Sequence, residues 1–348
     1  MGPSEQTWWL NSVLTSDYIC KIGSGIAGAM RAIENDFSKM DCCYGWAAFR
    51  FIKAVYKFWG LPTEELVFKS ILDQWEKPYG SFNTGLKISA PYMNASGRSD
   101  TALMNVIINV GVQLSAYVRV FTNKDDLDSI TDQEVSEFKR VFKMGALGDD
   151  SITFFPDTPN LAERVEKYVA QYGFETRDMK IHSDFRKITF LGMHPYPVVD
   201  TGRKTLAWGP TIGRFLFKHG YCEGEPTHPR DWLKDVATAS NLMFRWLPIV
   251  GDLARREIDL LEAYEKKCNR FHRVDALKVI DELFKYKAAF RYYSDIKTDY
   301  RMDEYMHAVY GLSKEGVQEI IKQINEVSVL PSLINSSEMI RVVRQDTG

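Results

Sequence analysis

The feature that most constrains the fold of this chain is the segment Gly145–Ser151, which reads Gly-Ala-Leu-Gly-Asp-Asp-Ser. Apolar and β-branched residues flank it, Val141–Phe142 on one side and Ile152–Phe154 on the other. Such arms around a glycine turn predict a β-hairpin that presents Asp149 and Asp150 at its tip. Neighbouring carboxylates repel each other, and a divalent cation, which prefers oxygen ligands, offsets that repulsion. An acidic surface turn has the same pattern, so this segment alone predicts no function.

A second motif is Asn35–Asp41, in which four residues separate Asp36 from Asp41. We expect a strand that carries Asp36 at its end, followed by a turn. This arrangement presents the Asp36 carboxylate to a metal and puts Asp41 further along, near a bound ribose. Taken alone, the same spacing is typical of two solvated turn acids.

A third motif, Ser96–Asn105, runs directly into an apolar segment. A Ser-Gly turn that leads into a helix allows the backbone to approach a nucleotide or template closely. Thr101 and Asn105 are four residues apart and therefore share one helical face. A glycine turn, an N-cap and a buried helix explain the pattern as well, although polar residues facing one way favour function.

The order of the three motifs is more specific than any one of them. They read D-x4-D, SG-x3-T-x3-N and GDD, and they begin about 50 to 60 residues apart. In this order they resemble motifs A, B and C of the palm of RNA-directed RNA polymerases from positive-strand RNA viruses. Residues 172–180 resemble motif D and Thr189–Gly192 resembles motif E, so the resemblance covers about residues 30–200. Phe190–Gly192 followed by Gly213–Leu216 is most similar to the noda-like viruses.

The resemblance implies nucleotidyl transfer that depends on two divalent cations, Mg²⁺ or Mn²⁺. Asp36 and Asp149, with Asp150 nearby, are the implied metal ligands and catalytic carboxylates. Lys180 matches the motif D lysine, which acts as a general acid for the pyrophosphate leaving group. Arg177 lies near it in the sequence.

The resemblance also implies a nucleotide site. Its members are Asp41, Ser96, Gly97, Thr101 and Asn105. Asp41 and Asn105, together with Thr101 and Ser96, would read the ribose 2′-hydroxyl. Related reverse transcriptases place a bulky aromatic residue at the position of Asp41, so an aspartate there favours ribonucleotides. The implied ligands are NTPs, an RNA template and the nascent strand.

The predicted fold class is α+β, with a polymerase palm, an antiparallel sheet covered by helices, followed by an all-helical thumb. The palm is expected over residues 30–205, with a fingers insertion at about 42–95, and the thumb over 206–348. Amphipathic segments after Pro229 support the thumb. They are Trp232–Trp246, Asp252–Cys268, Asp275–Tyr292, Met302–Tyr310 and Lys314–Glu326.

The residues before the first motif predict that the fingers are largely absent. Just Lys21 and Arg31 are basic there, whereas the family carries a basic fingers motif that contacts the triphosphate. Residues 1–29 are therefore expected to be a remnant of the fingers. We expect the chain to be part of a larger replicase and to polymerise poorly or not at all by itself.

Composition limits the alternatives. The net charge of −2 argues weakly against coating by nucleic acid, and the five cysteines form no CxxC pair, which favours reduced thiols. No uninterrupted apolar stretch reaches 18 residues, so no transmembrane segment is predicted. The resemblance implies the host cytoplasm, at membrane-associated replication complexes reached through regions outside this chain. The alternatives are a reverse transcriptase, another palm polymerase, or a non-catalytic RNA-binding replicase fragment.

Overall fold

The computed structural model describes residues 30–347, apart from 77–78, 82, 90, 93, 95–100, 201, 223, 225, 227, 269–295 and 331–335. The chain divides between Asp184 and Phe185 into two compact units, called here the N-terminal unit and the C-terminal unit. Both units combine helices with antiparallel strands, which confirms the predicted α+β class.

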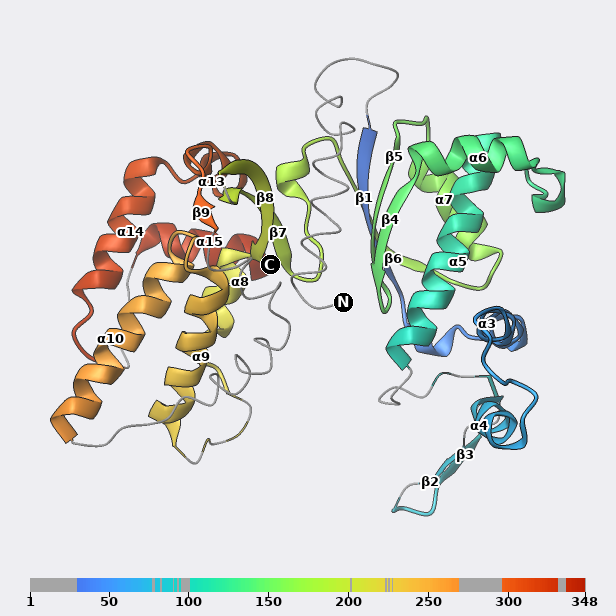
Figure 1. Cartoon of the computed structure of the whole chain (residues 1–348), viewed down its shortest axis with the longest axis horizontal. Helices are drawn as coiled ribbons and strands as arrows, with labels where there is room; N and C mark the ends of the chain where they lie inside the picture. The colour runs from blue at the N-terminus through green and yellow to red at the C-terminus, as the bar shows by residue number, and fades with distance from the viewer. Residues whose placement is uncertain are drawn as a thin grey trace. The chain divides into compact units, whose positions relative to one another are not determined.

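The N-terminal unit is built on a four-stranded sheet. Its strands lie in the order β4-β5-β1-β6, and each is antiparallel to its neighbours (Figure 1). Because the order does not follow the chain, strands distant in sequence become neighbours. The strands are β1 (Met30–Phe37), β4 (Lys143–Leu147), β5 (Asp150–Pro156) and β6 (Thr176–His182).

Three helices lie on one side of this sheet: α5 (Thr101–Thr122), α6 (Asp132–Val141) and α7 (Leu161–Ala170) (Figure 1). Alternate residues of a strand point to opposite faces, so one face of β1 and β5 supplies the core. Ile33 from that face is fully buried and packs in one cluster with Ile108 of α5. The helix predicted over Leu161–Tyr172 ends slightly earlier, and Gly173 follows it in the left-handed conformation with φ +80°.

The segment between β1 and α5 forms a smaller helical part of the same unit. It contains a 3-10 turn, two helices and a hairpin: Met40–Cys42, α3 (Trp46–Phe58), α4 (Leu66–Glu76), β2 (Tyr79–Ser81) and β3 (Lys87–Ser89). Phe49, Ile52 and Tyr56 recur at helical spacing and fix α3 to the core cluster. This is the region of the predicted insertion at about 42–95, whose identity as fingers stays a prediction.

Helix α5 has the length and the apolar composition of a membrane-spanning helix. It is the one helix of the described residues for which this holds, and half of its apolar stretch is buried inside the protein. Its buried side chains pack against the sheet and against α7. That packing is what a core helix of the N-terminal unit requires.

The C-terminal unit combines a three-stranded sheet with helices. Strands β7 (Met193–Asp200) and β8 (Arg203–Pro210) form a hairpin, and β9 (Lys297–Thr298) pairs with the other edge of β7. Tyr196 and Tyr305 are among the largest side chains in its core. The helices are α8 (Ile212–Lys218), α9 (Pro229–Phe244), α10 (Val250–Cys268), α13 (Met302–Tyr310), α14 (Lys314–Glu326) and α15 (Ser337–Thr347).

The helix predictions for this unit are largely confirmed. The bounds of α13 and α14 are those expected, and the Ser313 hydroxyl accepts a hydrogen bond from the Gly316 backbone N–H as an N-cap. The expectation that residues 206–348 are all-helical was wrong, because β8 extends to Pro210 and β9 adds a strand. A strand of two residues has no periodicity that a sequence pattern can reveal. The helix expected over 275–292 lies outside the described residues.

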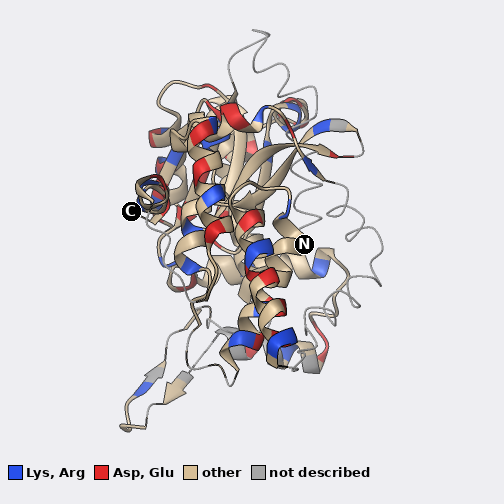
Figure 2. Cartoon of the chain, turned by 90° about the vertical axis from the view of Figure 1, so that its left-hand side faces the viewer, with Lys and Arg blue, Asp and Glu red and all other residues tan. Residues whose placement is uncertain are grey.

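Charges on the C-terminal unit are mixed in sign. On the helices that face the viewer in Figure 2, basic and acidic residues alternate along the surface. A surface of this kind is typical of a solvated helical face and gives no single-sign field.

Candidate active site

Three aspartates lie side by side across three adjacent strands. The strand register pairs Asp36 of β1 with Asp150 of β5 on one side and with Asp178 of β6 on the other. Directly paired residues present their side chains on the same face of a sheet, so the three carboxylates share one row. Like charges in such a row destabilise the sheet. The end of β1 is therefore a concentrated site of negative charge.

The predicted hairpin is present, with Asp149 in its turn. Leu147 pairs with Asp150, so Gly148 and Asp149 alone form the connection. Gly148 has a φ of +64°, in the left-handed region that favours glycine. One detail differs from the prediction. Val141 ends α6 rather than joining an arm, and Phe142 follows as the C-cap in an extended conformation, so β4 begins at Lys143.

The Asp36 carboxyl interacts electrostatically with Asp149. Burial raises the pKa of Asp36, the nearby Asp149 carboxylate raises it further, and the Arg177 guanidinium lowers it in part. Arg177 Nη1 lies 3.8 Å from Asp36 Oδ2. Thus the metal ligands expected from the first and third motifs occupy one electrostatic site, to which Arg177 also belongs.

The donor set at this site fits a hard divalent cation. Carboxylate oxygens are its preferred ligands, and Mg²⁺ is commonly held by one or two carboxylates together with water and phosphate oxygens. Asp36 and Asp149 supply such a pair. No group of three or more His, Cys, Asp or Glu side chains with metal-ligand geometry occurs among the described residues.

A second polar cluster surrounds Asp41. Its Oδ1 accepts hydrogen bonds from Asn105 Nδ2 and from Asn94 Nδ2, each at 3.0 Å. Asn105 Oδ1 in turn accepts from the Tyr44 hydroxyl at 2.7 Å and from Asn94 Nδ2 at 3.0 Å. Asp41 and Asn105, predicted from two different motifs, are therefore in direct contact.

The remaining predicted nucleotide residues are less informative. Thr101 is the first residue of α5, one turn before Asn105, as the four-residue spacing predicts. Ser96 and Gly97 lie outside the described residues.

Lys180 lies on β6 beside the aspartate row. It is paired with Glu34 in the register, one step along the same face from Asp178, and its Nζ lies 3.1 Å from Asp178 Oδ2. The cation that contacts Asp36 is Arg177 instead. The role of Lys180 as the general acid stays a prediction.

Sequence reasoning missed four residues of these clusters: Asn94, Tyr44, Asn109 and Asp178. A signal existed for Asn109, because it follows Asn105 by one helical turn inside an apolar helix, where a polar residue is costly. No local signal marks Asp178, since only the pairing of β6 with β1 brings it beside Asp36.

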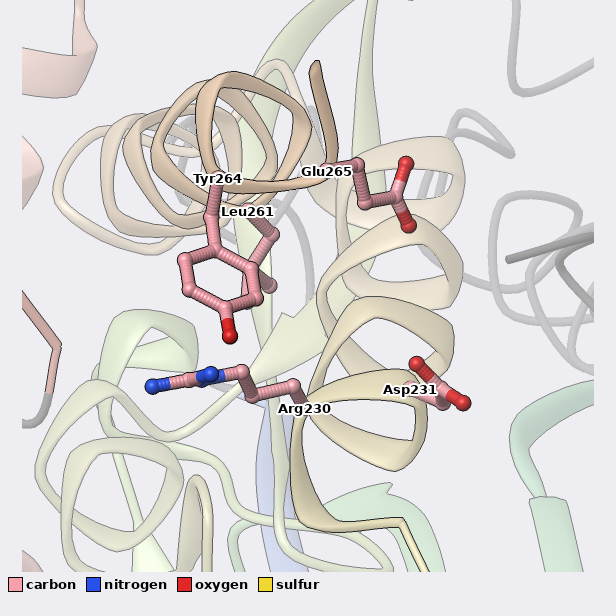
Figure 3. A pocket seen from close by; sticks show the side chains of 5 residues that line it. All are labelled: Arg230, Asp231, Leu261, Tyr264 and Glu265. Atoms are coloured by element: carbon pink, nitrogen blue, oxygen red, sulfur yellow. The ribbon is translucent and has the colours of Figure 1, made fainter. Parts of the chain in front are cut away.

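A small pocket lies between α9 and α10 in the C-terminal unit (Figure 3). The Arg230 guanidinium lies 3.8 Å from the centre of the Tyr264 ring, while Asp231 and Glu265 point away from it. The cavity measures about 40 Å³, room for a few water molecules and too little for a nucleotide. This pocket contains none of the predicted site residues.

Comparison with known proteins adds no family. No model of a known protein family matches the chain, and no curated protein matches it significantly.

Proposed function

We propose that this chain carries the palm and thumb of an RNA-directed RNA polymerase. In this function it transfers nucleotides from NTPs to the 3′ end of an RNA strand under the direction of an RNA template. The observation that supports it best is that residues of three separate motifs lie around the first turns of α5 and the end of β1. Asp36 and Asp149 share one electrostatic site, and Asp41 contacts Asn105.

The carboxylate pair supports a reaction at phosphate. Divalent cations bound by Asp36 and Asp149, with Asp150 beside them, would supply positive charge at the reacting phosphoryl group. The chain itself contributes fixed geometry, because a two-residue turn and a paired strand hold the carboxylates without further rearrangement.

The cluster around Asp41 supports recognition of a ribose. Its amide and hydroxyl groups are already oriented by one another, so a sugar hydroxyl meets donors and acceptors in fixed positions. Lys180 would hold the proton that the leaving group takes up, and its ammonium must then leave Asp178. The RNA partners and an action at membrane-associated complexes in the host cytoplasm rest on the sequence resemblance.

Primer extension on an RNA template tests the proposal. The wild-type chain is incubated with Mg²⁺ or Mn²⁺ and with either NTPs or dNTPs. We expect ribonucleotide incorporation, and we expect Asp149→Asn to lower it about 1000-fold because a charged ligand at the reacting phosphate is lost.

Asp73→Asn is the matched control, since Asp73 is an exposed aspartate on α4. It makes the same change of charge away from the site, and we expect it to be neutral. Incorporation of dNTPs in place of NTPs would indicate a reverse transcriptase. Because the chain is expected to polymerise poorly by itself, the assay is repeated with a fingers region supplied as a second chain. No incorporation with either set of nucleotides under both conditions would overturn the proposal.

A further inference from the structure

Helix α5 carries a row of polar side chains inside the core of the N-terminal unit. Asn105, Asn109 and Gln113 are four residues apart and therefore lie on one face of the helix. Asn109 and Gln113 are fully buried, each with a side chain that is 0% exposed. Burying an amide is costly unless it is hydrogen-bonded, so the contacts of these two side chains matter.

Asn109 contacts the backbone of the turn that carries Asp149. Its Nδ2 lies 2.9 Å from the carbonyl oxygen of Asp149, 3.2 Å from that of Gly148 and 3.4 Å from that of Asp150. Three consecutive carbonyls thus converge on one amide nitrogen. The connection has two residues, Gly148 and Asp149, and Gly148 is in the left-handed conformation. The Asn109 amide is therefore a direct contact between α5 and the backbone of this short turn.

Gln113 holds the neighbouring part of the site one helical turn further along. Its Nε2 donates to Ser151 Oγ at 3.1 Å, and Ser151 Oγ donates to the Asn35 carbonyl at 3.3 Å. Asn35 directly precedes Asp36. The same helix therefore holds both strands that carry the two carboxylates.

We propose that Asn109 is a positioning residue that sets the place of the Asp149 carboxylate relative to Asp36 by fixing the backbone of the 148–150 turn. What the two carboxylates do chemically rests on the proposed function, whereas the positioning itself does not. Helix α5 also carries Asn105, which lies about 6 Å before Asn109 along the helix axis and donates a hydrogen bond to Asp41. One rigid element thus fixes the carboxylate pair and the polar cluster in a common frame.

The test removes the donor and keeps the branching at Cγ, with the somewhat larger Asn109→Leu in the full chain. Two quantities are measured. The first is amide hydrogen exchange of the peptide that spans residues 145–152, in the presence of EDTA, so that no cation contributes. The second is primer extension at varied NTP concentration.

We expect exchange of that peptide to become at least about tenfold faster, because a buried hydrogen-bond donor is lost. We expect kcat to fall about 100-fold, the effect of a small misplacement of catalytic groups, with the KM for NTP changed less than about threefold. Tyr117→Phe is the matched control. It removes a fully buried hydroxyl from α5, about two helical turns after Asn109. Asn109 Nδ2 contacts the Gly148–Asp149 turn and this hydroxyl is not one of those contacts, so both readouts should stay within about twofold.

The two readouts separate the two proposals. If the wild-type chain incorporates no nucleotide even when a fingers region is supplied, the proposed function fails, and the exchange measurement still decides the positioning role. Equal exchange of residues 145–152 in the wild type and in Asn109→Leu would overturn that role, as would an unchanged kcat. If Asn109→Leu does not fold, Asn109→Ser, which keeps a shorter donor, is expected to show about tenfold lower kcat, and wild-type values for this variant would equally overturn it.

Discussion

The two units differ in how they treat buried polar groups. In the C-terminal unit the hydroxyls of three core tyrosines are hydrogen-bonded: Tyr196 to the Pro210 carbonyl, Tyr305 to the Arg186 carbonyl and Tyr310 to the Ile212 N–H. In the N-terminal unit, by contrast, amide atoms of three buried asparagines, Asn35, Asn94 and Asn109, find no partner among the described residues. Buried polar atoms without a partner are fewer in the described part of the C-terminal unit, where they are Thr211 Oγ1 and Asn241 Oδ1. Stable cores normally satisfy such atoms. The C-terminal unit therefore satisfies more of its buried polar groups than the N-terminal unit does.

Charges show the same difference. In the C-terminal unit His219 and Glu257 form a buried pair at 2.6 Å, and Lys234 and Glu265 form another at 2.7 Å. In the N-terminal unit the row of Asp36, Asp150 and Asp178 places like charges together. Arg177 near Asp36 and Lys180 near Asp178 offset part of the repulsion within this row, and both side chains are largely exposed, unlike the paired charges of the C-terminal unit.

The largest effect that would sharpen this comparison is on the buried pair of the C-terminal unit. Glu257→Ala is expected to lower the free energy of unfolding by about 3 kcal/mol, because it leaves His219 buried without its acceptor. Urea unfolding measures it. Glu262→Ala on the exposed face of the same helix α10 is the control and is expected to change it by less than about 0.5 kcal/mol. A loss for Glu257→Ala no larger than the control would remove the argument that this pair stabilises the unit.

The next effect concerns the polar cluster of the N-terminal unit. Asn105→Ala removes a donor to Asp41 and the acceptor of Tyr44, so we expect discrimination between ribonucleotides and deoxyribonucleotides to fall about tenfold. A single-turnover incorporation assay measures the ratio. Thr122→Ala at the other end of α5 serves as the control, since its hydroxyl donates to the Val118 carbonyl of the same helix. If Asn105→Ala discriminates as well as the wild type, the ribose is read elsewhere.

A smaller effect is expected for a core hydroxyl of the C-terminal unit. Tyr310→Phe leaves the Ile212 N–H without an acceptor and is expected to cost about 1 kcal/mol of unfolding free energy. Thermal unfolding compares it with Tyr300→Phe, whose side chain is 70% exposed. Equal melting temperatures for the two variants would mean that the tyrosine network does not contribute to stability.

The smallest effect should have the opposite sign and lies in the N-terminal unit. Burial and Asp149 raise the pKa of Asp36, so the folded chain binds this proton more tightly than the unfolded chain does. The stability that the proton contributes is complete below the ordinary pKa of about 4 and is lost as the pH rises through the raised folded pKa. Asp36→Asn is therefore expected to be more stable than the wild type at pH 7, by about 0.5 kcal/mol after solvent screening.

Urea unfolding at pH 4 and pH 7, in the presence of EDTA, checks this expectation. The difference between Asp36→Asn and the wild type should grow from the lower to the higher pH. A wild type that is the more stable of the two at pH 7 would contradict the idea that this unit gives up stability at its site.

Local elements were predictable because their causes are local. The hairpin around Gly148 follows from a glycine that can adopt positive φ between two arms, and α14 follows from Ser313 as N-cap and an amphipathic repeat. Half of the candidate site was predictable too. Asp36, Asp41, Asn105 and Asp149 were found from the order of three motifs, although each motif alone was ambiguous.

The sequence by itself determined the bounds of α13 and α14 and the approximate course of α7, α9 and α10, and it predicted which side chains carry the chemistry. The tertiary structure alone decided which of them meet: Asp178 beside Asp36, Asn94 against Asp41, and Asn109 beneath the Asp149 turn. The physical reason is that a cap or a turn is stabilised within a few residues, so its pattern is visible in the chain. Strand register and helix-to-turn packing join residues far apart in sequence, as Asn109 and Asp149 are, and depend on how the whole core is filled.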